Sequence, residues 1–477
     1  MNQLNVPLLN ALTAHISTKP VSFHVPGHKY GTVLDGEAAV YFSEIMKLDA
    51  TELSGLDDLH SPEGAIHEAA QLLAELYGVE ESFFLVNGST VGNLAMIASV
   101  CGEGDKILVQ RNCHKSIING IRLAKAEPIF IEPVFNGEWK VACGLDVPAV
   151  HKALACYPEL KAIVLTYPNY YGIADPIGDI ISAAHLKGIP VLVDEAHGAH
   201  FIAGAPFPQS AVELGADIVV QSAHKTLPAM TMGSFLHFNS KLVELTRLKD
   251  YLQMLQSSSP SYPIMASLDL ARNFLGTINK RDLKNLLEHI NRFRGELADI
   301  PQIRVLENEG KADPLKVVIQ AACGLNGYEI QKLLEHQGIF TELADPHNIL
   351  LILPLLKEGM DYPFKNAARK IAEALAHYPA VSPTPLESSS GGCLSGLALS
   401  LNEMDGLPCE VIELTKAVGL ISAETIIPYP PGIPVILKGE RITKRMASRL
   451  AELKKSGSRF QGGQRLTAGE ILIYRKG

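Results

Sequence analysis

Between residues 82 and 240, short apolar runs alternate with amphipathic stretches. Helical patterns, for example over 91–100 and 177–187, separate several of the runs. Strands that are apolar throughout and alternate with helices predict an α/β fold, in which helices cover both faces of a mostly parallel sheet. Such a sheet binds its ligand at the carboxyl ends of its strands. The predicted strands are 82–86, 106–110, 128–132, 162–166, 190–194, 218–221 and 234–238.

The remaining chain predicts additional parts around this sheet. A helix is expected over 67–77 before the sheet and another over 262–275 after it. Residues 300–380 combine three strand-like runs with a helix at 327–336, which is an α+β pattern. The Ser-, Pro- and Gly-rich stretch 383–395 is expected to be a linker. The last 80 residues are expected to hold a helix pair, a proline-rich extended segment and a final strand at 470–474.

Composition excludes several classes of protein. With 477 residues, 47% hydrophobic and 19% charged, the chain suits a globular protein of two or three domains. A net charge of −9 argues against a nucleic-acid partner. The seven cysteines are scattered and odd in number, so they indicate free thiols, and we predict no metal site. Neither a signal-peptide pattern nor a membrane-length apolar run is present, so we expect a cytoplasmic protein without a membrane partner.

Lys225 is the first residue that indicates chemistry. It lies in SAHKTLPAMTMGS (222–234), just after a predicted strand and beside Ser222, His224 and Thr226. A lysine amine can form an imine with an aldehyde cofactor when burial or cationic neighbours keep part of it unprotonated. The alternative is a solvated lysine on a loop, and the motif alone does not decide between them.

Asp194 ends the apolar run of VLVDEAHGAH (191–200), 31 residues before Lys225. A carboxylate at this place can pair with a protonated pyridine nitrogen and keep the ring a strong electron sink. The alternative is that Asp194 caps a following helix. His197 could face a cofactor or bind a loop carbonyl, and both stay open.

VNGSTVGN (86–93) follows a predicted strand and opens a helix. Gly88 permits a tight turn, and Ser89, Thr90 and the first helical amides could hold a phosphate dianion. His114, in RNCHKS, could stack on an aromatic cofactor ring, although a single histidine is more often structural. Phosphate turn, histidine, strand-end aspartate and lysine follow in the order of aspartate-aminotransferase-type, or fold type I, pyridoxal-phosphate enzymes.

On these motifs the sequence resembles the Orn/Lys/Arg decarboxylase family, in particular its shorter, bacterial biosynthetic-type members. The resemblance runs nearly end to end. Beyond the motifs above it includes FHVPGHKYG (23–31), LDDLHSPEG (56–64) and PYPPGIPVILKGERIT (428–443), the most family-specific of them. It implies a fold type I large domain over 1–265, a small α+β domain over 266–385 and a C-terminal α+β domain of the family's type over 386–477.

The resemblance also implies the roles of the site residues. Lys225 would hold pyridoxal 5′-phosphate as a Schiff base, Asp194 would pair with the ring nitrogen, and His114 would stack on the ring. Lys225 or His224 would return a proton to the substrate carbon after CO2 leaves. The phosphate would be bound by Ser89, Thr90, Ser222 and His224. Glu424, with Glu440 as second choice, would recognise the distal cation of the substrate; the alternative for either is a surface salt bridge or a cap.

The reaction implied is decarboxylation of a basic amino acid to an amine, with arginine favoured over lysine and ornithine and a place in polyamine biosynthesis. A homodimer or tetramer with its active site at the dimer interface is expected, because FHVPGHKYG begins too early to leave room for the N-terminal wing of the large acid-inducible members. Two alternatives stay open. An aminotransferase or lyase could use Arg304 or Arg369 to bind a carboxylate, and a catalytically idle descendant could merely bind the cofactor.

Overall fold

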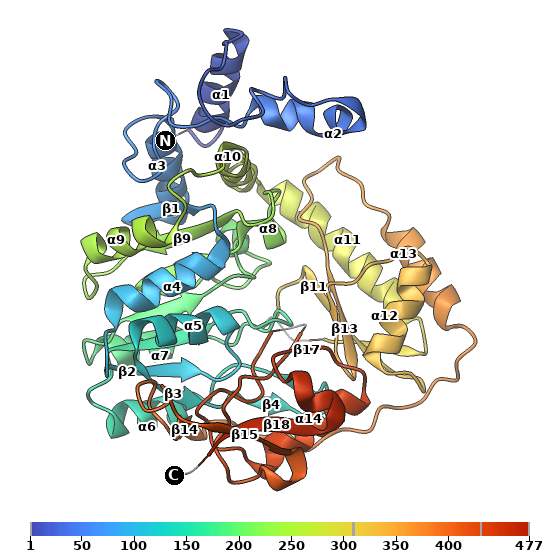
Figure 1. Ribbon diagram of the computed structural model, residues 1–477. Coiled ribbons are helices and arrows are strands. Elements are labelled where there is room, and N and C mark those ends of the chain that lie inside the picture. The colour runs from blue at the N-terminus through green and yellow to red at the C-terminus, as the bar shows by residue number, and fades with distance from the viewer. Residues whose placement is uncertain (1, 308–310, 430–431, 476–477) are drawn as a thin grey trace. The chain divides into compact units, whose positions relative to one another are not determined.

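The computed structural model describes residues 2–307, 311–429 and 432–475 (Figure 1). The chain divides into two compact units, each built from two separate stretches. Met1–Val100 and Pro190–Lys280 form the first unit, and Cys101–Ile189 and Arg281–Gly477 form the second. The domain boundaries expected at 265/266 and 385/386 stay predictions.

Four strands form the sheet of the first unit. β7 (Val191–Asp194) runs parallel to β8 (Ile218–Gln221). β9 (Ser234–Phe238) is antiparallel to β8 and to β1 (Glu81–Leu85). β9 reverses direction because the connection from β8 contains only the four-residue helix α8 (Ala223–Thr226), whereas a parallel return needs a longer crossover.

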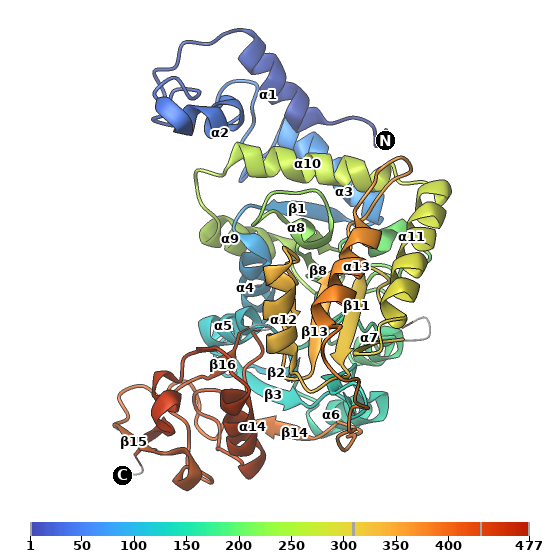
Figure 2. The ribbon, with the colours of Figure 1, turned by 90° about the vertical axis from the view of Figure 1, so that its right-hand side faces the viewer.

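Helices and strands of the first unit pack closely. In α4 (Gly88–Val100) a Cβ at Gly92 would lie 2.7 Å from a Leu85 methyl, so only glycine permits this helix-to-sheet approach. α10 (Tyr262–Gly276) lies beside β1 and α3 (Ala65–Tyr77) in Figure 2. Residues 19–47, here called the N-terminal arm, project from this unit and include α2 (Gly36–Lys47), none of whose residues is buried.

The second unit contains two main sheets. In the first, β2 (Lys106–Gln110) runs parallel to β3 (Glu127–Ile131) and to β6 (Ala162–Thr166), while β14 (Leu394–Gly396) is antiparallel to β3. Helices of this part are α5 (Lys115–Ala124), α6 (Val147–Cys156) and α7 (Gly178–His185). The second sheet is antiparallel and contains β10 (Ile303–Val305), β11 (Lys316–Ala321), β13 (Asn348–Ile352) and β12 (Leu343–Ala344) in that order, with α11 (Lys280–Ala298), α12 (Gly327–His336) and α13 (Phe364–Leu375).

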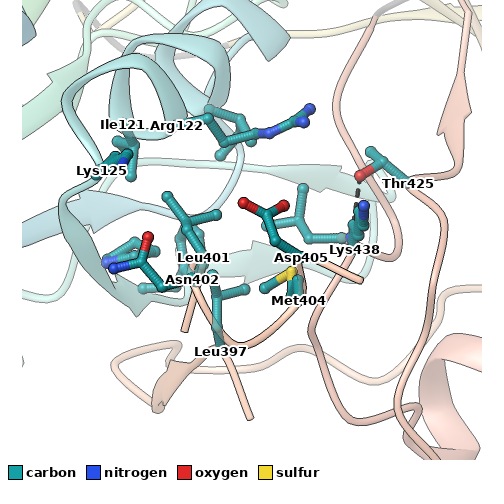
Figure 3. A pocket seen from close by; sticks show the side chains of 14 residues that line it. Ile121, Arg122, Lys125, Leu397, Leu401, Asn402, Met404, Asp405, Thr425 and Lys438 are labelled. Atoms are coloured by element: carbon teal, nitrogen blue, oxygen red, sulfur yellow. Dashed lines mark hydrogen bonds between the residues drawn. The ribbon is translucent and has the colours of Figure 1, made fainter. Parts of the chain in front are cut away.

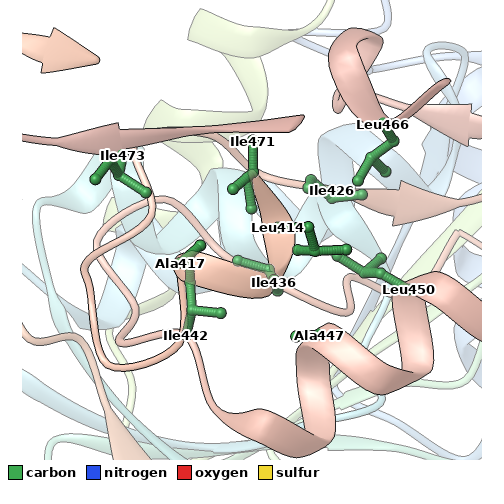
Figure 4. Close-up of a cluster of buried hydrophobic side chains, with 10 residues drawn as sticks. All are labelled: Leu414, Ala417, Ile426, Ile436, Ile442, Ala447, Leu450, Leu466, Ile471 and Ile473. Carbon is green, nitrogen blue, oxygen red and sulfur yellow. The ribbon is translucent and has the colours of Figure 1, made fainter. Parts of the chain in front are cut away.

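The C-terminal part of the second unit has its own hydrophobic core. β15 (Cys409–Glu413) pairs with β18 (Glu470–Tyr474), and β16 (Ile427–Pro428) pairs with β17 (Phe460–Gln461). The helix pair expected here is wrong: the described residues after 395 contain one α-helix, α14 (Lys444–Lys455), and short 3₁₀ turns. Figure 4 shows the core, which consists of Leu414, Ala417, Ile426, Ile436, Ile442, Ala447, Leu450, Leu466, Ile471 and Ile473.

The predicted strands agree with the structure to within one residue at each end, and the predicted helix at 327–336 coincides with α12. Within the described residues, no helix combines the length and the apolar character needed to cross a membrane.

Candidate active site

The first unit brings the two predicted serines together. Ser89 lies in the first turn of α4, and its hydroxyl accepts a 2.7 Å hydrogen bond from the Ser222 hydroxyl, just after β8. Gly88 has a left-handed φ of +78°, which suits glycine and turns the chain into the helix. Two hydroxyl groups therefore lie next to the free backbone amides at the N-terminus of α4, which is an arrangement that binds phosphate. Thr90 is exposed in the same turn.

Lys225 is half-buried on α8, and its Nζ lies 3.1 Å from Nε2 of His197. His197 comes from the loop after β7 and is buried. His224 is fixed by the Gly233 carbonyl, which accepts from its backbone amide at 3.1 Å and lies 2.9 Å from its Nδ1. Next to Lys225, the Thr226 hydroxyl is buried without a hydrogen-bond partner among the described residues. The lysine is therefore held beside an imidazole, which a solvated loop lysine would not be.

Asp194 is the last residue of β7 and is buried. One carboxylate oxygen accepts from Nδ2 of Asn93 at 2.9 Å, and the other accepts from the Ala196 amide at 3.2 Å. No helix of the described chain begins directly after Asp194, so Asp194 does not cap a helix there. Sequence reasoning missed Asn93, which lies on the buried face of α4 with no signal of its partner.

Glu195 was also missed, although it adjoins Asp194. Its carboxyl is fully buried and accepts from the Ser210 hydroxyl at 2.8 Å, the Ala211 amide at 2.6 Å and Nε2 of Gln221 at 2.6 Å. Burial raises the pKa of Glu195 to about 8, against the effect of these donors. The residue joins the loop after β7 to β8, and the only hint of it in the sequence is a second acid directly after a strand-end aspartate.

In the second unit His114 forms the N-cap of α5. Its Nδ1 lies 2.8 Å from the Ser116 hydroxyl and accepts from the Ser116 amide at 3.3 Å. Because Nδ1 accepts from an N–H group, the proton of the neutral ring is assigned to Nε2. The ring has a structural bond on one edge, and its stacking on a cofactor stays a prediction.

Both predicted substrate-binding acids are engaged within the second unit. The two oxygens of Glu424 accept from the Leu472 amide at 2.8 Å and the Gly463 amide at 3.0 Å. Glu440 is buried and pairs with Arg111 at 3.0 Å. Burial raises the pKa of Glu440, and the Arg111 guanidinium opposes that effect. Recognition of a distal cation by either acid stays a prediction, and it would have to occur with these contacts in place.

The residues of the first unit fit pyridoxal phosphate. They supply an amine beside an imidazole, a buried carboxylate held by an amide, and a pair of hydroxyls at the amide end of a helix. The unpartnered Thr226 hydroxyl could supply one more hydrogen bond to an anion. Groups of these kinds would attach the cofactor, bind its ring nitrogen and bind its phosphate.

Comparison with known proteins decides the family. Residues 6–312 match the model of the Orn/Lys/Arg decarboxylase major domain, and residues 401–472 match that of the Orn/Lys/Arg decarboxylase C-terminal domain. The chain belongs to the Orn/Lys/Arg decarboxylase family. This confirms the family predicted from the motifs. Two prolines of the most family-specific motif, 430 and 431, lie outside the described residues.

Individual relatives support the same assignment. The chain is 45% identical to a Bacillus subtilis protein named uncharacterized protein YaaO, over 99% of both chains. It is 35% identical to a Bacillus subtilis arginine decarboxylase, over 100% of this chain and 99% of that one. Among solved structures, the Francisella novicida lysine decarboxylase LdcF superposes with a TM-score of 0.80 at 20% identity, covering 98% of this chain and 81% of that one. The predicted fold class is thereby confirmed.

A separate cavity of about 150 Å³ lies in the second unit, between α5 and the segment 397–405 (Figure 3). Its walls combine apolar side chains such as Leu401 and Met404 with the charged Arg122, Asp405 and Lys438. The predicted site residues are not among those that line it. This cavity is therefore distinct from the groups that would hold the cofactor.

Proposed function

We propose that this protein removes the α-carboxylate of a basic amino acid, with arginine as the first candidate, using pyridoxal 5′-phosphate held by Lys225. The observation that carries the proposal is the placement of Lys225 Nζ 3.1 Å from His197, in the same unit as the buried Asp194 carboxylate and the Ser89–Ser222 pair. Family membership supplies the reaction class, and these residues supply the groups that such a reaction needs.

When bound, the cofactor supplies an electron sink for the pair of electrons left behind by CO2. Asp194 would keep the ring nitrogen protonated, and Asn93 would hold the carboxylate in place through its 2.9 Å hydrogen bond. Ser89, Thr90, Ser222 and His224 would bind the phosphate. His114 would lie on the ring face, with its orientation fixed through Nδ1 by Ser116.

Proton transfer would be the task of groups around Lys225. With the cofactor bound, the Lys225 amine and the neighbouring His197 ring would be the groups in place to return a proton to the substrate carbon. His224 is the other candidate, but the Gly233 carbonyl already lies 2.9 Å from its Nδ1. This contact holds the His224 ring in place and favours a role in which its Nε2 binds the phosphate.

Arginine is favoured because the relative of 35% identity over the full chain is named an arginine decarboxylase. Lysine is second and ornithine third. A planar guanidinium and a compact ammonium would be recognised by carboxylates in different geometries. Glu424 is proposed for this role from the resemblance alone, with Glu440 as the second choice.

A homodimer or tetramer in the cytoplasm completes the proposal. The N-terminal arm exposes large apolar side chains, with Val21 80%, Phe23 94%, Val40 79% and Tyr41 79% accessible. Large exposed apolar side chains favour burial against another protein surface, and a second copy is the partner that we propose. All seven cysteines are free, in keeping with a reducing compartment.

The attachment of the cofactor is tested first. The apo-protein is loaded with pyridoxal phosphate, reduced with borohydride and digested, and the peptides are weighed by mass spectrometry. We expect the cofactor's mass on the peptide that contains Lys225 and its loss in Lys225→Ala. Attachment at a different lysine would contradict the assignment.

The reaction is tested by product analysis with arginine. We expect CO2 and an amine in equal amounts. A keto acid without CO2 would replace the decarboxylase by an aminotransferase, and cofactor attachment without any product would support a binding-only protein.

A further inference from the structure

A deeply buried ion pair of the second unit joins two segments that lie far apart in the sequence. Arg111 directly follows β2, three residues before His114, and Glu440 ends the segment that begins at Pro428. Nη2 of Arg111 lies 3.0 Å from Oε2 of Glu440, and the two side chains are 7% and 3% exposed. Two charges are seldom removed from water to this extent unless their geometry is fixed by further bonds.

Arg111 makes those additional bonds to the same segment. Its Nη1 donates to the Pro434 carbonyl at 2.9 Å, and its Nη2 donates to the Val435 carbonyl at 3.2 Å. The guanidinium also lies over the Phe130 ring, 5.2 Å from its centroid. The guanidinium spreads its donors over two nitrogens in a fixed plane, and these bonds use both of them. A lysine has one nitrogen and therefore could not reproduce this arrangement.

The Glu440 side chain stabilises the turn formed by residues 437–440. The oxygen bound by Arg111 also accepts from the Leu437 amide at 2.8 Å. The Glu440 carbonyl accepts from the Ser422 amide at 2.9 Å, which ties the segment to the C-terminal core. Oε1 of Glu440 is buried without a hydrogen-bond partner among the described residues.

The segment held in this way reaches the ring of His114. Gly432 is buried at a left-handed φ of +89°, and its amide donates to the Pro428 carbonyl at 3.0 Å. A Cβ added to Gly432 would lie 3.5 Å from Cδ2 of His114 and 3.4 Å from the Tyr429 ring. The glycine therefore borders one edge of the imidazole, while Ser116 binds Nδ1.

We propose that Arg111 and Glu440 are positioning residues, whose buried pair holds Gly432 against His114 and so fixes the plane of the imidazole ring. The inference rests on the proposed function, because that function places the His114 ring on the cofactor. It also gives Glu440 a role different from direct contact with the substrate. The Glu440 carboxylate acts through Arg111 and the turn, which leaves Glu424 as the acid proposed to bind the substrate's distal cation.

The test uses Arg111→Lys, Glu440→Gln and Gly432→Ala, with Arg272→Lys as the control. Arg272 is a fully buried arginine of the first unit that pairs with Asp269, so its replacement reports the general effect of disturbing a buried ion pair. Pyridoxal phosphate is titrated into each apo-protein, the visible absorbance and circular dichroism of the loaded protein are recorded without substrate, and kcat and KM for arginine follow.

We expect each of the three variants to bind the cofactor about tenfold more weakly and to change the circular dichroism of the bound cofactor. Because a small displacement of a group at the site slows the reaction more than it weakens substrate binding, kcat should fall on the order of 10- to 100-fold while KM stays nearly unchanged. Arg272→Lys should lower the melting temperature without changing the cofactor's spectrum. The double variant Arg111→Lys with Gly432→Ala should be no worse than the poorer single variant, because both disturb the same contact.

Two results would overturn the inference. One is a wild-type spectrum and cofactor affinity in Arg111→Lys and Gly432→Ala. The other is a Glu440→Gln variant with a normal spectrum and a raised KM for arginine, which would make Glu440 a substrate contact. Gly432→Ala leaves the ion pair intact, so it carries the test if Arg111→Lys does not fold. Cofactor affinity and spectrum decide the inference even if the wild-type protein releases no CO2, a result that would count only against the proposed function.

Discussion

Replacing Glu195 by glutamine should remove a pH dependence of stability that the wild-type protein shows. Glu195 directly follows β7 and its carboxyl is fully buried, and burial raises its pKa from 4.5 to about 8. Three donors, from Ser210, Ala211 and Gln221, oppose this effect because they favour the ionised form. We expect burial to dominate, so the folded protein holds a neutral carboxylic acid at neutral pH.

The sign and size of the effect follow from proton linkage. Above pH 4.5 the unfolded chain releases this proton, whereas the folded protein keeps it up to about pH 8. Unfolding therefore releases a proton in this window, and a rise in pH favours the unfolded state. The stability that Glu195 contributes is complete below pH 4.5 and is lost as pH rises toward 8. One group changes the free energy by about 1.4 kcal/mol per pH unit, hence by about 3 kcal/mol between about pH 5.5 and 7.5.

Urea denaturation at these two pH values measures the effect. The free energy of unfolding of the wild-type protein should fall relative to that of Glu195→Gln by about 3 kcal/mol between the lower and the higher pH. The control is Glu288→Gln, which removes an exposed carboxylate on α11 that takes no part in the Glu195 hydrogen bonds. Equal pH slopes for wild type and Glu195→Gln would mean that the three donors keep Glu195 ionised, and the reasoning would be refuted.

Three more predictions concern separate parts of the molecule. Asn93→Ala should lower kcat/KM for arginine at least about tenfold in initial-rate assays, because a hydrogen bond to a buried carboxylate, here Asp194, is worth about 1.5–3 kcal/mol; an unchanged kcat/KM would contradict the positioning of Asp194. Arg272→Met should reduce the free energy of unfolding in urea by about 3–5 kcal/mol, because it leaves the buried Asp269 charge without its partner. Tyr41→Asp should shift the sedimentation profile toward monomer, because it places a charge on the exposed apolar arm; an unchanged profile would place the subunit contact elsewhere.

The strands β7 and β8 could be predicted from the sequence because three of the four residues of each are apolar. β7 and β8 are buried at every position, so their residues form continuous hydrophobic runs that stand out from the flanking polar segments. β14 gave no such signal. Leu394–Gly396 contributes one half-buried and two exposed residues at the edge of its sheet, and the Ser- and Gly-rich sequence around it was interpreted as a linker. Its pairing with β3 depends on tertiary contacts that propensity does not encode.

The site divides in the same way. Lys225 and Asp194 were recognisable candidates because Lys225 closely follows a predicted strand, Asp194 ends one, and each carries an ionisable group. Asn93 could not, because an asparagine on a buried helix face has no pattern that identifies its partner. The pairing of Arg111 with Glu440 spans 329 residues, and no local pattern indicates which charge a distant glutamate will meet. Sequence reasoning therefore identified Lys225 and Asp194 as candidate reacting groups and missed the side chains that hold Asp194 and Glu440 in place.

The proposed decarboxylation is measured as CO2 release by the cofactor-loaded protein, offered arginine, lysine and ornithine separately. We predict release from arginine, slower or absent release from the other two, and no release from any of them by Lys225→Ala. Loaded protein that shows Lys225-dependent cofactor attachment but releases CO2 from none of the three amino acids would contradict the account.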